Sequence, residues 1–328
     1  MNPEWYLPLI FAGLMALAML MYVVLDGYDL GVGILFPFAD DAVKDEMVSS
    51  IGPFWDANET WLVLGIGILL IAFPKAHGEI LAALYLPVFF MLIGLILRGV
   101  AFDFRYKAKT EYKSFWDAMF FVGSLLASLA QGFMLGRYIM GFDSDLAATL
   151  FACMTAICTA AGYGLLGATW LAMKTEKQTL EKTIRWAKRC LVLTVLGVVA
   201  VSIATPLVNE RIFEKWFSFP TLFWLSPIPL VTAVLMLQCF HTLNSPDNTR
   251  LWQPFAFSVG IFILSFCGLA YSLFPYLVQD SIDIWQAASA IESLQFVLWG
   301  VLIAVPAIML YTAFSYRVFW GKTDDLSY

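Results

Sequence analysis

Four carboxylates and one arginine stand within otherwise apolar stretches of the sequence. Asp26 and Asp29 are three residues apart, Asp56 and Glu59 repeat that spacing, and Arg98 ends a long apolar run. A three-residue spacing places two side chains on the same face of a helix. Ionisable groups inside an apolar helix are costly and need a partner, water or a task. These five residues are therefore the first candidates for chemistry.

Two interpretations of this group are open, and both can hold together. Arg98 could neutralise one or two carboxylates and so lock three helices to one another. Alternatively, a carboxylate that is crowded by like charge and shielded from water could take up a proton and pass it inward. In the combined interpretation, Asp29 and Arg98 form a structural charge pair. Asp56 is then the proton relay.

The composition places these residues in a membrane protein. Of the 328 residues, 61% are hydrophobic and 13% are charged, whereas soluble domains have roughly 45–50% apolar and about 25% charged residues. This much apolar surface cannot be hidden in one core. A soluble enzyme, a disordered chain and a disulfide-stapled secreted module are excluded, and the net charge of −6 gives no reason to expect nucleic acid as a partner.

Apolar runs that are long enough to cross a bilayer predict an all-α protein with nine spanning helices joined by short loops. Such a helix needs roughly 20 mostly apolar residues. The run that follows Thr60 is too short unless its helix begins near Ile51, which brings Asp56 and Glu59 inside it. We expect a single membrane domain over residues 1–328, with two four-helix bundles and one peripheral helix. The predicted spans are 7–36, 51–74, 79–102, 115–139, 146–173, 189–208, 217–241, 252–275 and 292–318.

Lysines and arginines predict the orientation, because they are enriched in cytoplasmic loops. Fifteen of the nineteen follow the odd-numbered spans or end the third, and the other four are Lys75, Arg137, Arg211 and Lys215. We therefore expect the N-terminus outside and the C-terminus in the cytoplasm. Three successive helices then place the four carboxylates and Arg98 at the same cytoplasmic depth.

The two histidines argue against a redox centre held by this chain alone. His77 falls in an outer loop, whereas His241 ends the seventh predicted helix on the cytoplasmic side. They cannot jointly ligate one haem or metal. We therefore expect no metal ligand set in this chain, and a redox centre in a partner.

Two local patterns predict packing. Glycines at positions 27, 31 and 33 would let neighbouring helices approach closely beside the acidic residues. In the longest outer loop, the stretch 281–289 (SIDIWQAAS) could lie flat on the membrane as a short amphipathic helix.

Several stretches resemble subunit II of the cytochrome bd-type quinol oxidases. They are LDGYDLGVG (25–33), GPFWDANETWLV (52–63), ILRGVAFDFR (96–105), FWDAMFFVGS (115–124), SIDIWQAAS (281–289) and LYTAFSYRVFWG (310–321). Together with the nine-helix layout, the resemblance covers most of the chain. The short total length is similar to that of the cyanide-insensitive branch.

The resemblance implies a subunit of a terminal respiratory oxidase in the bacterial inner membrane, one that oxidises quinol and reduces dioxygen to water. In the family, two haems b, one haem d and the quinol-oxidation loop belong to subunit I, the expected partner. Some complexes add a small single-span accessory subunit, and some members hold a structural quinone in subunit II. The isolated chain is expected to be inactive.

The resemblance also assigns roles to individual residues. Asp26 and Asp56 match members of the proton path toward the haems, and with Glu59 they are the expected proton relay. At the position of Glu59 some relatives have an uncharged residue.

Asp29, Trp55 and Arg98 match positions that support assembly of the haem site. Trp61 matches the region where dioxygen enters from lipid in some members.

A proton-coupled secondary transporter is the alternative. Transporters place acidic residues near the middle of the membrane, often beside broken helices, whereas here the acids gather toward one face. A purely structural scaffold for a redox partner would differ only in lacking the relay.

Overall fold

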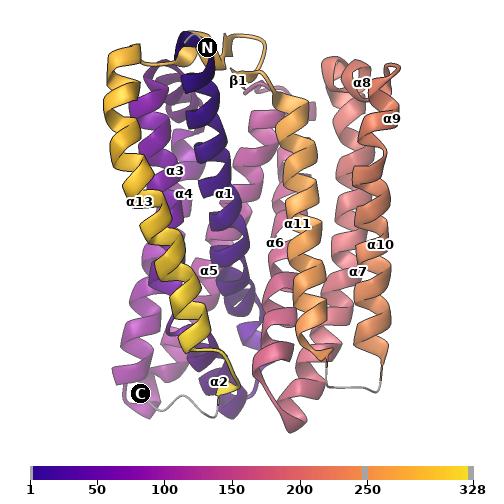
Figure 1. The fold of residues 1–328 in the computed structure, drawn as a ribbon. Helices are drawn as coiled ribbons and strands as arrows, with labels where there is room; N and C mark the ends of the chain where they lie inside the picture. The colour runs from indigo at the N-terminus through magenta and orange to yellow at the C-terminus, as the bar shows by residue number, and fades with distance from the viewer. Residues whose placement is uncertain (1–2, 246–249, 324–328) are drawn as a thin grey trace.

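The computed structural model describes residues 3–245 and 250–323, and these residues are almost entirely helical (Figure 1). Within them, nine helical segments are long and apolar enough to cross a membrane. This confirms the predicted all-α fold with nine spans. The long helices are α1 (Pro3–Leu35), α3 (Trp55–Ala72), α4 (Pro74–Lys107), α5 (Thr110–Ile139), α6 (Leu146–Lys174), α7 (Lys177–Val208), α10 (Pro227–Asn244), α11 (Trp252–Leu273) and α13 (Ile291–Val318).

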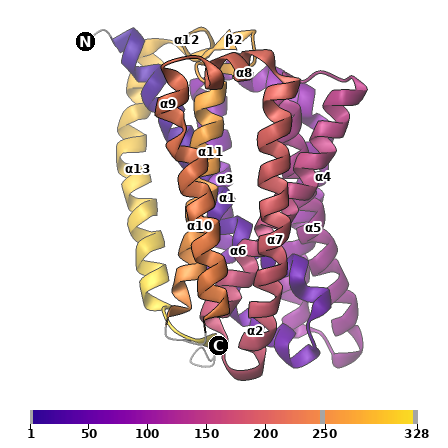
Figure 2. The same cartoon turned by 90° about the vertical axis from the view of Figure 1, so that its right-hand side faces the viewer.

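The long helices run side by side in two groups of four, with one helix at the edge (Figures 1 and 2). In the first group, α1 packs against α3 and α5, and α4 packs against α3 and α5. In the second, α6 packs against α7 and α11, and α10 against the same two helices. The contact of α1 with α6 joins the groups, and α13 lies against α1. The two expected bundles and the peripheral helix are therefore present.

Short elements close the two ends of the bundle (Figure 1). At one end lies α2 (Asp41–Ile51), which follows the 3-10 turn η1 (Phe36–Phe38) and is called here the α2 end. At the opposite end, called the hairpin end, the strands β1 (Tyr276–Val278) and β2 (Ile282–Asp283) pair antiparallel. The remaining short helices are α8 (Glu210–Phe217), α9 (Thr221–Leu225) and α12 (Ile284–Ala287).

Several helix boundaries differ from the predicted spans. Helix α3 begins at Trp55 rather than Ile51, because Ile51 ends α2 and residues 52–54 form a turn between the two helices. Residue 53 in this turn is a proline, which has no backbone N–H to donate within a continuous helix. Helix α7 begins twelve residues earlier than the predicted residue 189, at Lys177. Its added turns are rich in charge, so hydropathy alone gave no sign of them.

The stretch 281–289 does not form the flat amphipathic helix that the sequence suggested. It contributes β2 and the four-residue helix α12, whose start is capped reciprocally by Asp283 and Gln286. A helix lying beside the spans at this end is instead α8, with a polar face that carries Arg211 and Lys215. The charged residues of α8 recur at the spacing of a helix. The helix is so short that in the sequence it looks like a loop between two apolar runs.

Helices α1 and α6 approach closely through two glycines, as the pattern at 27, 31 and 33 predicted. A Cβ atom on Gly31 would lie 1.8 Å from the carbonyl oxygen of Tyr163. A Cβ atom on Gly167 would lie 2.4 Å from the backbone of Gly31. Only hydrogen fits at these positions, so the crossing depends on glycine in both helices. The crossing fixes the stretch of α1 that carries Asp26 and Asp29.

Candidate functional site

A buried ion pair joins α1 to α4 near the α2 end. Nη1 of Arg98 donates to Oδ1 of Asp26 across 2.6 Å, and the two residues are 1% and 0% exposed. The other terminal nitrogen of Arg98, Nη2, donates to the carboxylate of Glu59 on α3. A single guanidinium therefore bridges three helices, using its fork geometry on two carboxylates. We call Asp26, Glu59 and Arg98, together with Asp29, the acid site.

Asp29 belongs to this site through an amide rather than through the arginine. The structure corrects the expected pairing of Asp29 with Arg98, because both terminal nitrogens of Arg98 are engaged by Asp26 and Glu59. Oδ2 of Asp29 instead accepts a hydrogen bond of 2.8 Å from Nδ2 of Asn58. Asp29 is 0% exposed. Its carboxyl group is therefore held by a neutral donor.

A small ring of hydrogen bonds surrounds that amide. Nδ2 of Asn58 lies 3.0 Å from the hydroxyl of Tyr28, and the hydroxyl of Tyr316 donates to Oδ1 of Asn58 across 3.2 Å. The two tyrosine hydroxyls are 2.6 Å apart. The ring brings α13 to the acid site. Tyr316 lies 258 residues after Asn58 in the chain, so no local pattern could have identified this partner.

Asp56 and Glu59 lead from the surface toward the arginine. Asp56 is exposed in the first turn of α3, and the side chain of Glu59 one turn later is 27% exposed. Arg98 and Asp26 follow, both buried. The carboxylates therefore form a graded series from exposed to buried. All four predicted carboxylates lie in this region, although Asp56 makes no direct ion pair among the described residues.

A second chain of polar side chains runs from Asp26 into the bundle. The Tyr22 hydroxyl lies on α1 one turn before Asp26, and both residues are buried. Nε2 of Gln131 donates to that hydroxyl across 2.7 Å. Oε1 of Gln131 accepts from the hydroxyl of Tyr163, also across 2.7 Å. Sequence reasoning missed this chain because isolated tyrosine and glutamine residues in apolar helices give no distinct signal.

Trp55 covers the helix turn that carries Arg98. The Trp55 and Phe102 rings are 5.1 Å apart between centroids. A Cβ atom on Gly99 would lie 3.4 Å from the Trp55 ring, so this glycine allows the indole to lie against α4. Trp61, by contrast, is 1% exposed and packs with Ala18 and Tyr22 in a small core between α1 and α3. The two tryptophans therefore flank the acid site at different depths.

Three atoms of the acid site have no hydrogen-bond partner among the described residues. They are Oδ2 of Asp26, Oδ1 of Asp29 and Nε of Arg98, each shielded from the surface. Buried polar atoms are rarely left unpaired, and exceptions mark strain or function. The site therefore carries polar groups beyond those needed to hold the helices together.

A separate charged cluster fastens α2 to the spanning helices. Nε of Arg105 donates to Asp117 across 2.5 Å, and Nη1 of Arg105 donates to Asp45 of α2 across 2.6 Å. The Lys44 ammonium lies 3.0 Å from the other oxygen of Asp117. Arg105 and Asp117 are both buried. This cluster, together with the buried side chains of Val43, Met47 and Ile51, holds the eleven-residue helix α2 against the spanning helices.

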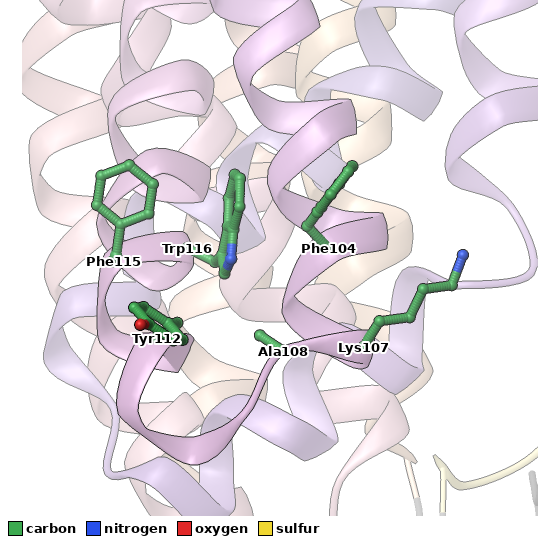
Figure 3. A pocket seen from close by; sticks show the side chains of 6 residues that line it. All are labelled: Phe104, Lys107, Ala108, Tyr112, Phe115 and Trp116. Atoms are coloured by element: carbon green, nitrogen blue, oxygen red, sulfur yellow. The ribbon is translucent and has the colours of Figure 1, made fainter.

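An aromatic pocket lies at the turn between α4 and α5 (Figure 3). The rings of Phe104 and Trp116 face each other with their centroids 5.1 Å apart. The Lys107 ammonium points away from the rings (Figure 3). Its lining carries no carboxylate, so it is distinct from the acid site. The lining residues are Phe104, Lys107, Ala108, Tyr112, Phe115 and Trp116.

The histidines of the chain do not fit a shared ligand set for haem. His77 lies in the first turns of α4, at the hairpin end, whereas His241 lies near the end of α10, at the α2 end. Within the described residues, no group of three or more histidine, cysteine or acidic side chains could hold a metal ion.

The fold and the site define a multi-pass membrane protein in which one buried arginine is shared by carboxylates of neighbouring helices. A sequence model of the family "Cytochrome bd terminal oxidase subunit II" matches residues 7–319. The chain therefore belongs to the family of cytochrome bd oxidase subunit II, as its motifs suggested. Membership of this family decides against the alternative that the chain is a proton-coupled secondary transporter.

Individual proteins that are similar to this chain are also components of bd oxidases. Cytochrome bd-I ubiquinol oxidase subunit 2 of Escherichia coli K12 is 27% identical over 94% of this chain and 93% of its own length. Cytochrome bd ubiquinol oxidase subunit 2 of Bacillus subtilis is 35% identical over 135 residues, 40% of each chain. A chain in the structure of bd oxidase from Geobacillus thermodenitrificans has the same fold, with a TM-score of 0.80, 15% identity and 96% and 99% coverage.

Membership of this family places the chain in the bacterial inner membrane as a multi-pass subunit of a respiratory quinol oxidase. It also implies a partner, subunit I, and haem in the complex.

Proposed function

We propose that this chain supports the haem-bearing subunit I of a quinol:dioxygen oxidoreductase and supplies its proton path from the cytoplasm. One observation carries the proposal: the carboxylates run from exposed Asp56 through half-buried Glu59 to buried Asp26, with Arg98 between the last two. A structural ion pair would need only one carboxylate for each arginine. The additional, partly exposed acids are what a path from water to the interior requires.

The geometry suggests how a proton would move. Asp56 collects it at the surface, and Glu59 receives it one helical turn further along α3. A protonated Glu59 releases its hold on the guanidinium, which leaves Arg98 free to strengthen its contact with Asp26. The guanidinium keeps its charge throughout. Haems of the partner supply the electron chemistry that consumes the protons.

The remaining site residues are assigned supporting roles. Arg98, Asp29 and Trp55 would hold α1, α3 and α4 in the arrangement that the partner's haem site requires. Trp61 lies in the core between α1 and α3, so a dioxygen path past its ring would run between these helices and not along the lipid surface.

For the path to begin in the cytoplasm, the α2 end must face it. The enrichment of lysine and arginine after the odd-numbered spans supports this orientation. Cysteine labelling tests it: Lys109→Cys at the α2 end should react with a membrane-impermeant reagent only after the cells are opened. Asp143→Cys, exposed at the hairpin end, should react in spheroplasts, with the unmodified chain as background. The reverse pattern would refute the proposed orientation.

The relay is tested by substituting its outermost member. The Asp56→Asn variant of the complete oxidase should consume dioxygen more slowly with quinol as donor, while its haem content stays normal. Asp103→Asn is the matched control, because Asp103 is also an exposed carboxylate near the α2 end but lies outside the series. Full activity of Asp56→Asn with normal haem would remove Asp56 from the path.

A further inference from the structure

We propose that Asp29 is the acid-site carboxyl that holds a proton at rest, and that Asn58 is the residue that positions it. The proposal rests on the proposed function of the acid site and deepens it, because it names where the proton waits. It also changes the role of Asp26, which becomes the permanent counter-ion of Arg98.

Charge counting requires a neutral carboxyl. Asp26, Asp29 and Glu59 meet one cation, Arg98, so full ionisation would leave a net charge of −2 in this region, from three negative charges and one positive. Uncompensated buried charge is strongly unfavourable. Arg98 directs its two terminal nitrogens to Asp26 and Glu59. Asp29 is the carboxyl that receives neither of them.

The hydrogen-bond ring leaves Asp29 with a single donor. Because the Tyr316 hydroxyl donates to Oδ1 of Asn58, its oxygen must accept from the Tyr28 hydroxyl across the 2.6 Å contact. The Tyr28 oxygen in turn accepts from one N–H of Asn58. Both tyrosine protons are then committed within the ring. The second N–H of Asn58 is shared by Oδ2 of Asp29 at 2.8 Å and the carbonyl oxygen of Leu25 at 3.3 Å.

One neutral N–H is too little for a buried carboxylate. An ionised carboxylate can accept at several lone-pair sites and is usually met by charged or multiple donors. Oδ1 of Asp29 has no partner among the described residues. Leaving an oxygen of a neutral carboxyl unpaired costs far less than leaving one of a carboxylate unpaired. The arrangement therefore favours the protonated form.

Asp26 has the opposite surroundings. Its Oδ1 receives the guanidinium of Arg98 at 2.6 Å. A guanidinium at this distance stabilises the charged form of a carboxylate. The two aspartates, three residues apart on α1, are thus adapted to different protonation states.

The charges of the groups around Asp29 determine how it can lose and regain its proton. Arg98 acts on it as a positive charge, Asp26 and Glu59 act as negative charges, and the Asn58 amide and the tyrosine ring are neutral. When the partner consumes a proton, the O–H bond of Asp29 breaks and the proton leaves. Asp29 becomes an anion that Arg98 and Asn58 stabilise until a proton arriving through Glu59 restores it. No electron moves in this step.

Infrared spectroscopy of the complete oxidase tests the assignment. The carbonyl stretching band of a protonated carboxyl should disappear in Asp29→Asn, whose haem content should stay near wild type because asparagine mimics the neutral acid. Asn58→Leu should keep the band but shift it to higher frequency, since the hydrogen bond to Oδ2 is removed. An unchanged spectrum in Asp29→Asn, or an unshifted band in Asn58→Leu, would overturn the proposal.

Assembly gives a second, independent outcome. If Asp29→Asn loses haem as severely as Asp29→Ala, the carboxyl is needed in its charged form and the proposal is wrong. The spectrum is recorded without turnover, so it does not depend on the relay. Loss of the band in Asp29→Asn together with full activity of Asp56→Asn would support the proton at Asp29 while refuting the path through Asp56.

Discussion

Nη1 of Arg98 on α4 lies 2.6 Å from Oδ1 of Asp26 on α1, with both side chains shielded from the surroundings. The same guanidinium engages Glu59 of α3. One arginine therefore sets the relative positions of the three helices that carry all the candidate acids. Removing it would leave two buried or half-buried carboxylates without their counter-charge.

We predict that Arg98→Ala destabilises the subunit by about 3–5 kcal/mol, the usual cost of breaking a buried ion pair from one side. The complex should lose haem or subunit association, because α1, α3 and α4 shift apart. Haem content per purified complex measures the effect. Arg185→Ala, which removes an exposed arginine of α7, is the control and should leave haem content unchanged. Wild-type haem content in Arg98→Ala would contradict the prediction.

Gly31→Ala should destabilise the fold, since its new methyl group would lie 1.8 Å from the carbonyl oxygen of Tyr163. Backbone on both sides must move apart to admit it, and overpacking of this kind costs about 1–3 kcal/mol or more. Gly13→Ala on the same helix is the matched control, because a methyl group there meets nothing within 4 Å. Thermal unfolding in detergent should separate the two variants, and equal stability would show that the α1–α6 contact is looser than described.

The cluster at α2 predicts the effect of Asp117→Ala. That change leaves Arg105 and Lys44 without the carboxylate they share, so α2 should loosen from α4 and α5. We expect faster protease cleavage within residues 39–54 and a lower unfolding temperature. Asp103→Ala removes an exposed carboxylate nearby and should do neither. Unchanged cleavage in Asp117→Ala would mean that other contacts hold α2.

The same cluster predicts a dependence on alkaline pH. Burial alone would lower the pKa of Lys44, but hydrogen bonds to Asp117 and Asp41 outweigh it, and the pKa is raised. A raised pKa in the folded protein means that Lys44 stabilises α2 below its unfolded pKa of about 10.4. This stabilisation is lost as the pH rises through the higher folded value. The stability difference between wild type and Lys44→Gln should therefore shrink above about pH 10.5, and a constant difference would contradict it.

Apolar length and charge spacing were enough to predict the nine spans and the five residues Asp26, Asp29, Asp56, Glu59 and Arg98. They succeed because lipid imposes long apolar helices and makes each intramembrane charge conspicuous. The pairing within the site was not predictable. Whether Asp26 or Asp29 reaches the arginine depends on how α1 is rotated, which contacts such as the Gly31 crossing determine. The spacing of the two aspartates in the sequence does not distinguish between them.

The neutral members of the site were also beyond sequence reasoning. Asn58 lies between Asp56 and Glu59 and could be mistaken for an ordinary polar residue at a helix start. Its role becomes visible only through its hydrogen bonds to Tyr28 on α1 and Tyr316 on α13, two helices other than its own. Helix α2 was missed for a different reason. It is polar overall, and both its short apolar face (Val43, Met47 and Ile51) and its ion pairs meet residues that are distant in the sequence.

In the proposed function, protons for dioxygen reduction enter through the acid site of this subunit. The most direct test of this proposal follows the pH of a weakly buffered solution with an indicator dye while the fully reduced complete oxidase reacts with dioxygen. We expect Asp56→Asn to take up protons more slowly than wild type at equal haem content, whereas Asp103→Asn should not. Equal rates of proton uptake in all three proteins would contradict it.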